Sequence, residues 1–392
     1  MTFTFSADSS HILINTCGLT VYFHLILTDS CNLCCNYCRG KIFDTPVLER
    51  KTIPIDDSVP SEITWKFEEL YRFLQKDPDA VLTFIGGEPT LRPDLICSIM
   101  EHAPVRRFII QTNGLLLHRL PPDIVNRFET ILISIDGDRP LTDAMRGEGV
   151  YNRVMENIHH ILAGGFQNEL IARMTVTEKT DIHQAVHHLA RNNDFPFTSI
   201  HWQIDADFWN DYPMRSFCQW ATSSYIPGIK QLAADWIEYM RRTGTVPRWY
   251  PFIDPVEDLL YNRKTRLRCG SGYTNYSIQT DGTIIPCPIM VGIKDYYAGT
   301  LTGSGPADLK QYSVEGRCKS CDILDFCGGR CLYSSIMQPW PPEGAEFVCA
   351  TVRALYKTLT SVLPEIKELI EKGVISKDDL VHEKFNGCEI IP

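Results

Sequence analysis

The sequence lacks a long apolar run, a signal-like N-terminus and an excess of positive charge. No stretch approaches about 18 uninterrupted apolar residues, so we expect no membrane-spanning helix. Residues 1–15 contain neither a basic segment nor a long apolar segment, so they do not indicate a secretory signal, and a cytoplasmic protein is expected. The net charge of −10 argues against a nucleic-acid partner, because such proteins normally carry a basic face.

Cysteine, in contrast, is abundant. The 392 residues, 44% of them hydrophobic and 22% charged, are expected to form one large domain and a smaller one around a substantial core. Cytoplasmic thiols are kept reduced, so the 15 cysteines indicate metal binding or catalysis. A disulfide framework is the alternative interpretation.

Short apolar segments, rich in Val, Ile, Phe or Thr and bounded by turn residues, are predicted as strands. They are residues 20–27, 81–85, 107–111, 130–135, 170–176 and 199–204. Between them, apolar spacing and a proline at a first helical position predict helices. These helices cover residues 67–74, 93–103, 152–164 and 181–192. The alternation predicts an α/β fold with a parallel sheet, and six units predict an open, partial (β/α)6 TIM-like barrel.

Polar motifs follow the carboxyl ends of these strands, where barrels of this kind carry their chemistry. They are a cysteine loop after the first strand, Gly86-Gly87-Glu88-Pro89 after the second, Thr112-Asn113-Gly114 after the third, Ser134 and Asp136-Gly137 at the fourth, and Gln203 with Asp205 at the sixth. We therefore expect one functional rim.

The barrel is assigned to residues 1–213, followed by a helical linker over 214–265. Within this linker, residues 214–243 are predicted to be an amphipathic helix, and 244–265, which contain three prolines, a connecting segment. Residues 266–392 form a cysteine-rich C-terminal domain with a predicted helix over 352–372.

Cys31, Cys35 and Cys38 form the most informative motif. Three thiolates on one short loop can hold three irons of a [4Fe–4S] cluster and leave the fourth iron open for a small molecule. A zinc knuckle or buried free thiols are the alternatives, although zinc usually takes a fourth protein ligand and CxxC pairs. The pattern resembles the signature of the radical S-adenosylmethionine (SAM) superfamily, in which the open iron binds the amino and carboxylate groups of SAM.

This resemblance implies a set of SAM-binding residues. Gly86, Gly87 and Glu88 match the GGEP motif, whose backbone and Glu contact the SAM amino group, although alone the run is an ordinary strand-to-helix turn. The other matches are Tyr37, which would pack on the adenine, Ser134, which would hydrogen-bond SAM, Arg146, which would fix the SAM carboxylate as in sulfatase-maturing relatives, and Asn113, which would support the ribose. Taken singly, these residues also fit core packing, a surface charge or turn formation.

A second cysteine region resembles the SPASM domain, an extension of radical SAM enzymes that modify peptides and proteins. The cysteine spacing over Cys318–Cys331 also fits a zinc ribbon, which is the alternative interpretation. The resemblance implies one auxiliary [4Fe–4S] cluster on Cys318, Cys321, Cys327 and Cys349, and another on Cys269, Cys287 and Cys331. Residues 244–268 lack the cysteine that sometimes supplies the fourth ligand of the latter, so one iron is open or has an unidentified ligand.

Further cysteines are left unassigned and are expected to behave as buried small hydrophobes. They are Cys17, Cys34, Cys97, Cys218 and Cys388.

The resemblance covers residues 20–350 and implies a peptide- or protein-modifying radical SAM enzyme whose cofactors are SAM and three [4Fe–4S] clusters. SAM cleavage would give a 5′-deoxyadenosyl radical that abstracts hydrogen from the substrate, leading to a crosslink such as a thioether, an oxidation or an epimerisation. A monomer that takes electrons from a reductant such as ferredoxin or flavodoxin is expected. The thirty residues before Cys31 are too few for a leader-binding module, so a separate protein would supply recognition, or a short substrate would need none.

Two alternative functions stay open. Anaerobic sulfatase-maturing enzymes oxidise Ser or Cys to formylglycine, but they place an aspartate base directly after the position of Cys287, where this chain has Pro288. A non-catalytic carrier of several clusters would have no use for the GGEP run or Arg146. Asp205 and Asp207 lie near the sixth strand, and neither is assigned as a base.

Overall fold

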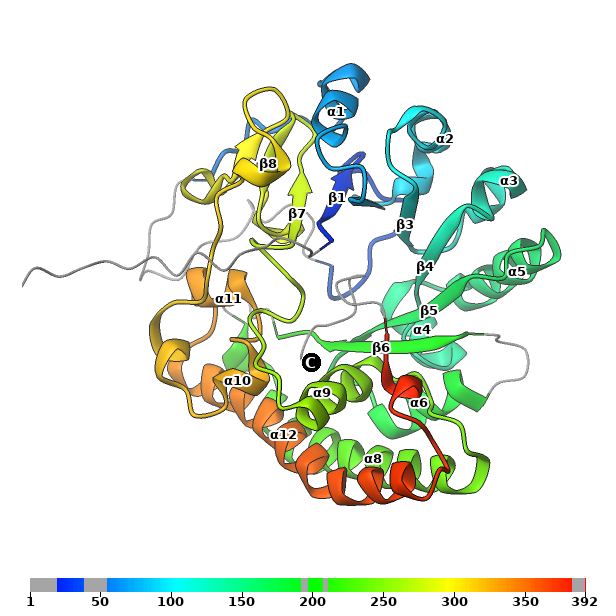
Figure 1. Cartoon of the computed structure of the whole chain (residues 1–392), viewed down its shortest axis with the longest axis vertical. Helices are drawn as coiled ribbons and strands as arrows, with labels where there is room; N and C mark the ends of the chain where they lie inside the picture. Colours follow the sequence, from blue (N-terminus) through cyan, green and yellow to red (C-terminus); the bar gives the residue numbers. More distant parts are fainter. Residues whose placement is uncertain (1–19, 39–54, 192–196, 207–210, 383–391) are drawn as a thin grey trace, which may run out of the picture.

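The computed structural model describes residues 20–38, 55–191, 197–206, 211–382 and 392. Within these residues, one sheet has the strand order β6-β5-β4-β3-β2-β1-β7-β8-β9 (Figure 1). The predicted strands are all confirmed and pair in parallel in chain order. They are β1 (Tyr22–Ile26), β2 (Val81–Ile85), β3 (Arg107–Thr112), β4 (Phe128–Ser134), β5 (Glu169–Val176) and β6 (Ser199–Ile204).

Helices follow these strands and cover the outer face of the curved sheet (Figure 1). They are α1 (Phe67–Leu74), α2 (Pro93–His102), α3 (Pro122–Val125), α4 (Arg139–Arg146), α5 (Val150–Ala163) and α6 (Ile182–Arg191). The expected α/β partial barrel is thus confirmed. The short helices α3 and α4 were not predicted, because their few apolar residues do not make a readable period.

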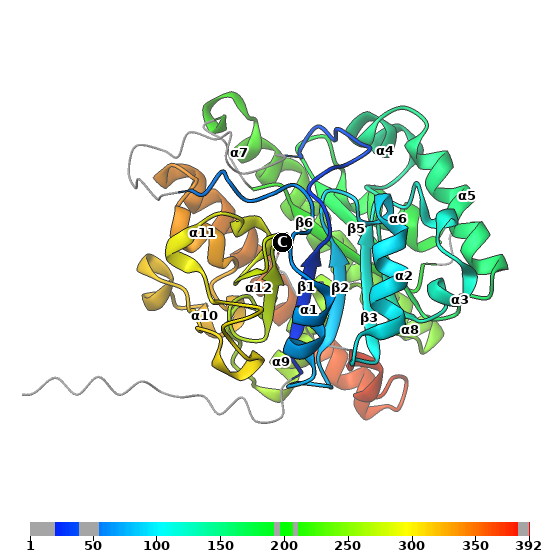
Figure 2. The same ribbon diagram turned by 90° about the horizontal axis from the view of Figure 1, so that it is seen from above.

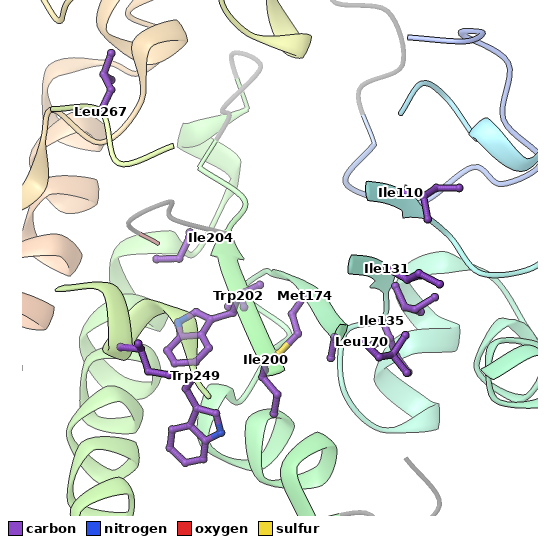
Figure 3. Packing of buried hydrophobic residues seen from close by; sticks show 14 of the residues in the cluster. Ile110, Ile131, Ile135, Leu170, Met174, Ile200, Trp202, Ile204, Trp249 and Leu267 are labelled. Carbon is purple, nitrogen blue, oxygen red and sulfur yellow. The ribbon is translucent and has the colours of Figure 1, made fainter. Parts of the chain in front are cut away.

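Side chains alternate between the two faces of each strand. Met174, Ile200 and Trp202 belong to the main core, which fills the space between the sheet and the helices (Figure 3). A smaller, separate apolar cluster comes from the opposite, inner face and consists of Tyr22, Val81, Ile109, Leu132, Ile171 and Tyr250. The barrel interior therefore has an apolar floor of its own.

The C-terminal region extends the same sheet. β7 (Asn275–Ile278) pairs in parallel with β1, and β8 (Thr283–Ile285) and β9 (Gly299–Thr300) follow as antiparallel strands. The cysteine-rich segments therefore lie beside the first strand of the barrel, and α10 and α11 lie on this side in Figure 2. Their bounds are α10 (Leu324–Cys327) and α11 (Leu332–Met337).

Two expectations for the helices need correction. Residues 244–265 are not only a connection, because α9 (Tyr250–Tyr261) forms there despite Pro251 and Pro255. Pro251 lies in the first turn, where proline is tolerated, and burial of Phe252 and Val256 outweighs the hydrogen bond that Pro255 lacks. The predicted helix over 352–372 is α12 (Pro342–Glu371), which begins ten residues earlier.

The predicted helix over 214–243 is divided. It comprises α7 (Phe217–Trp220), a π-helical stretch (Ala221–Tyr225) and α8 (Ile226–Thr243). Short 3₁₀ helices occupy Pro89–Leu91, Leu117–Arg119, Tyr212–Met214, Pro288–Met290, Lys294–Tyr296, Pro306–Asp308, Gly316–Ser320 and Asp378–Leu380. Among the described residues, no helix has the length and apolar character needed to cross a membrane.

Candidate functional site

The loop after β1 brings its three motif cysteines together. The Cys38 amide donates to the Cys35 carbonyl at 2.9 Å, and the Leu33 amide approaches the Cys31 sulfur at 3.4 Å. Burial raises the pKa of the Cys35 thiol to about 11, Arg146 opposes this rise, and the nearby Cys38 and Cys31 thiols add to it. Cys31 and Cys38 are exposed, so the group opens toward solvent.

Gly86 and Gly87 allow the next loop to lie directly against the cysteine loop. A Cβ on Gly86 would lie 2.3 Å from the Thr28 carbonyl oxygen, and one on Gly87 would lie 2.2 Å from that of Ser30. The amides of Gly87 and Glu88 donate to these same two carbonyls at 2.8 Å. The glycines are therefore required by a backbone-to-backbone approach that fixes where the cysteine loop begins.

The Glu88 side chain joins the ends of β2 and β3. It is 1% exposed, and its carboxylate accepts from the Thr112 hydroxyl at 2.6 Å and the Asn113 amide at 2.7 Å, in addition to Thr90. Burial raises its pKa, and these hydrogen bonds oppose the rise. The Asn113 side chain in turn donates to Asn32 in the cysteine loop at 2.8 Å.

Tyr37, Asp136 and Arg146 form a buried group at the rim. Arg146 donates two hydrogen bonds to the Asp136 carboxylate, both at 2.8 Å, and the Tyr37 hydroxyl donates to the same carboxylate at 3.0 Å. Arg146 is 6% exposed and Asp136 is fully buried, while the Arg146 guanidinium lies 5.4 Å from the Tyr37 ring centroid. The predicted SAM ligand Arg146 is thus already engaged with Asp136, a rim residue to which the sequence assigns no role.

A row of polar side chains lies on the inner face above the apolar floor. His24 has Thr83 and Ser277 as register partners on β2 and β7. All three are buried, and the hydroxyls of Thr83 and Ser277 have no hydrogen-bond partner among the described residues. Burial lowers the pKa of His24 to about 4, with a further contribution from Arg173, and a hydrogen bond with Asn275 opposes the change.

The opposite wall continues this row through Ser134, Arg173 and His201, which are register partners on β4, β5 and β6. His201 is fully buried, and neither of its ring nitrogens has a hydrogen-bond partner in the described chain. Burial and Arg173 lower its pKa. Buried polar groups of this kind are normally satisfied by water or a bound molecule, so the row indicates a polar chamber inside the barrel.

Sequence reasoning missed His24, Arg173 and His201. His24 and Arg173 each stand two residues after an apolar-floor residue of the same strand, Tyr22 and Ile171, and this alternation is a readable signal. Asp205, in contrast, lies 3.4 Å from the Arg215 guanidinium in an ion pair, and Asp207 lies outside the described residues.

A cavity of about 370 Å³ lies among the C-terminal cysteines, and its lining includes Cys318, Cys321, Cys327, Cys331 and Cys349. Burial raises the pKa of Cys327 to about 11, and the nearby Cys318 and Cys349 thiols add to it. Arg317 donates to the Cys349 sulfur at 2.8 Å, and Arg353 to the Cys321 sulfur at 3.6 Å. Five thiols thus line one cavity, and arginines contact two of them, which fits an iron–sulfur cluster, whose ligands are thiolates.

Cys269, Cys287 and Cys331 form the other group. Burial raises the pKa of Cys287, and Cys331 and Cys269 add to the rise, so the three thiols are close together. Among the described residues, every cysteine is a free thiol, which disfavours the disulfide framework. Cys17 and Cys388 lie outside the described residues, and Cys34 is exposed rather than buried.

Arg268 connects both cysteine groups to α9. Its guanidinium is 3% exposed, donates to Asp254 and Asp258, and also donates to the Phe326 carbonyl at 2.8 Å. Arg268 precedes Cys269 and Phe326 precedes Cys327, so one buried cation holds the backbone beside a cysteine of each group.

The sequence model of the radical SAM superfamily matches residues 25–190, from β1 to α6. Residues 25–190 form a radical SAM domain. A radical SAM domain uses SAM and a [4Fe–4S] cluster, and the three thiols that follow β1 supply a donor set of the required kind.

Relatives extend beyond the radical SAM domain. Mycofactocin maturase MftC of Mycolicibacterium smegmatis is 22% identical over 350 residues, which cover 82% of this chain and 81% of that protein. Molybdenum cofactor biosynthesis protein 1 of Homo sapiens is 28% identical over 151 residues, which cover 37% of this chain and 22% of that protein.

Solved structures share the fold. Native anSMEcpe with bound AdoMet and the Cp18Cys peptide has a TM-score of 0.65 at 16% identity and covers 89% of this chain and 99% of its own. Streptococcus suis SuiB bound to the precursor peptide SuiA has a TM-score of 0.53 at 15% identity, with coverage of 82% and 73%.

Proposed function

We propose that this protein is a radical SAM enzyme that modifies a peptide, with auxiliary clusters in a SPASM-type C-terminal region. The carrying observation is that the rim cysteines and the two C-terminal cysteine groups lie beside one barrel whose chamber is polar. The similarity to mycofactocin maturase covers 82% of this chain, and both anSMEcpe and SuiB were solved with peptides.

Cys31, Cys35 and Cys38 would hold the SAM-binding cluster. Cys318, Cys321, Cys327 and Cys349 would hold one auxiliary cluster, and Cys269, Cys287 and Cys331 the other, whose fourth ligand we leave unassigned. When bound, cluster and SAM supply one-electron cleavage of the carbon–sulfur bond, which gives methionine and a 5′-deoxyadenosyl radical.

The chain's own residues would orient SAM at the rim. The backbone of Gly86, Gly87 and Glu88 would receive the amino group, Asn113 would support the ribose, and Ser134 would hydrogen-bond SAM. Tyr37 would pack against the adenine, and Arg146 would act partly through Asp136, because its guanidinium is engaged there at 2.8 Å.

The polar chamber would receive the peptide. Arg173 places a positive charge between His24 and His201, and both histidines are held neutral by burial. The neutral His201 imidazole, whose two ring nitrogens have no hydrogen-bond partner in the described chain, would bind a polar group of the substrate, while the apolar floor excludes water from below. This arrangement limits quenching of a reactive radical.

A reductant such as ferredoxin or flavodoxin would supply the electron, and the protein would act as a monomer. A sulfatase-maturing function is the second candidate, favoured by the likeness to anSMEcpe but opposed by Pro288 at the position of the family's base.

The test is anaerobic reconstitution followed by reduction in the presence of SAM. We expect 5′-deoxyadenosine, and a peptide encoded beside this gene should change in mass or take up deuterium. A loss of two hydrogens would indicate a crosslink or oxidation. An unchanged mass in ordinary water, together with uptake of one deuterium when the reaction is run in D2O, would indicate an epimerisation. A protein that binds iron but never cleaves SAM would be an electron carrier, and formylglycine on a sulfatase peptide would support the second candidate.

A further inference from the structure

His183 and His187 on α6 and Asp235 on α8 form a group on the outer side of the barrel, separate from every cysteine site. The Nε2 atoms of His183 and His187 lie 2.8 Å and 2.6 Å from the same oxygen, Oδ2 of Asp235. The potential ligand atoms of the three side chains all lie within 4.8 Å of one another. We propose that these three side chains bind a divalent zinc-class cation.

The helix geometry builds this site. His183 and His187 are four residues apart, so they lie on one face of α6, one turn above the other. α8 approaches this face closely, because a Cβ on Gly228 would lie 2.6 Å from Cγ2 of Ile182. Asp235 is two helical turns beyond Gly228 and therefore lies on the same face of α8, opposite the histidines.

The ligand side chains are held in place. The His187 ring is T-shaped toward His183 at 4.5 Å and toward Trp249 at 5.9 Å, so aromatic neighbours on two sides fix its orientation. The side chain of His187 is 13% exposed, against 31% for His183 and 41% for Asp235. The group therefore has one buried wall and one side open for ion entry.

The donor set matches zinc chemistry. Two imidazole nitrogens and a carboxylate oxygen are common zinc ligands, and a water completes the tetrahedron where a site has three protein ligands and an open side. Borderline cations such as cobalt and nickel favour the same donors, whereas magnesium and calcium prefer oxygen. A bound ion would replace the two hydrogen bonds between the histidines and Asp235 Oδ2. His183, His187 and Asp235 would each coordinate the ion instead.

The position suggests a structural purpose. β6 is the edge strand of the sheet; α6 precedes it, and α8 follows it after α7 and the π-helical stretch. The ion would tie these helices together beside that edge and so stiffen the open side of the barrel. This proposal is independent of SAM chemistry.

The test uses the anaerobically reconstituted protein with its clusters in place, so that iron occupies the cysteine sites. Wild type, His183→Gln/His187→Gln, Asp235→Asn and the control His188→Gln would be dialysed against zinc, and metals measured by mass spectrometry. His188 is the next residue on α6, but its Nε2 faces the Tyr151 hydroxyl at 2.9 Å. We expect wild type and the control to hold about one zinc ion more than the other variants at equal iron content.

Thermal unfolding gives a second readout. Zinc should raise the melting temperature of wild type and His188→Gln but not of Asp235→Asn, which keeps the size of the side chain and should fold even if the double variant does not. Equal zinc content in wild type and Asp235→Asn, or no zinc in wild type, would overturn the proposal.

Discussion

The rim cysteines and the C-terminal cysteines differ in how their thiols are held. At the rim, Cys31 and Cys38 are exposed on one loop, and neighbouring strand ends fix that loop through Glu88 and Asp136. In the C-terminal region, half-buried cysteines line a cavity, and arginines contact two of the sulfurs. The exposed rim loop leaves room for a small molecule beside a cluster, whereas the half-buried C-terminal cysteines shield a cluster more from solvent.

The largest effect is expected from removing one rim thiol. Cys35→Ala should lower SAM cleavage by more than about 100-fold, because loss of a direct ligand exceeds the usual cost of losing its supporting partners. Iron in the C-terminal groups should remain. Quantified 5′-deoxyadenosine and iron content check this, and the exposed neighbour variant Cys34→Ser is the control that should change neither. Full SAM turnover by Cys35→Ala would contradict the assignment of the rim site.

Removing Arg268, the cation of a buried ion pair, should destabilise the C-terminal region. Arg268→Leu leaves Asp254 and Asp258 without their cation, and removing one partner of a buried pair costs about 3–5 kcal/mol. We expect lower stability and loss of auxiliary iron while the rim cluster persists. Urea unfolding and Mössbauer spectra measure both, and Arg241→Leu, which breaks an exposed pair with Glu365, should change little. An unchanged amount of auxiliary iron in Arg268→Leu would show that Arg268 does not position the cysteines of these clusters.

Lowering the pH should destabilise the barrel more than the C-terminal region. The pKa of His24 is about 4 in the folded barrel against 6.5 when unfolded, so its stabilising contribution is complete above pH 6.5 and is lost as the pH falls toward 4. Over that interval the loss is about 3 kcal/mol. In the C-terminal region, Arg353 holds the pKa of Asp322 at about 2, so that pair stays ionised.

Hydrogen exchange of the loaded protein between pH 7 and pH 5 tests this difference. β1 and β7 should open more readily at the lower pH, and His24→Gln should remove most of that dependence. An equal pH response in the variant would assign the effect to other groups.

The smallest effect is expected from weakening the hydrogen bonds that Arg146 and Tyr37 donate to Asp136, which follows β4. Arg146→Lys replaces a two-bond contact with Asp136 by a point charge and should raise the KM for SAM about tenfold, while Tyr37→Phe removes one hydrogen bond and should do less. If Arg146 acts by positioning, the reduced rim cluster should change its EPR spectrum without SAM in both variants. An unchanged spectrum with a raised KM would instead support direct contact with the SAM carboxylate.

The sequence indicated most of the barrel, because each strand is a short apolar run and each cysteine group has a specific spacing. The sequence did not indicate α9, because Pro251 and Pro255 argue against a helix there. The helix is explained only by the burial of Phe252 and Val256 in the folded structure. Nor did the sequence explain Gly86 and Gly87, whose need for a bare backbone arises from carbonyls that the fold brings against them.

The sequence alone determined local features. The spacing of apolar residues indicated the strands and helices, and the number of residues between cysteines indicated the candidate ligands. What only the tertiary structure decided is which distant groups meet. Arg146 with Asp136, Arg268 with α9, His24 with Arg173, and α6 with Asp235 all depend on how strands and helices pack. Spacing along a chain cannot encode these encounters, because they are set by the burial of side chains between elements.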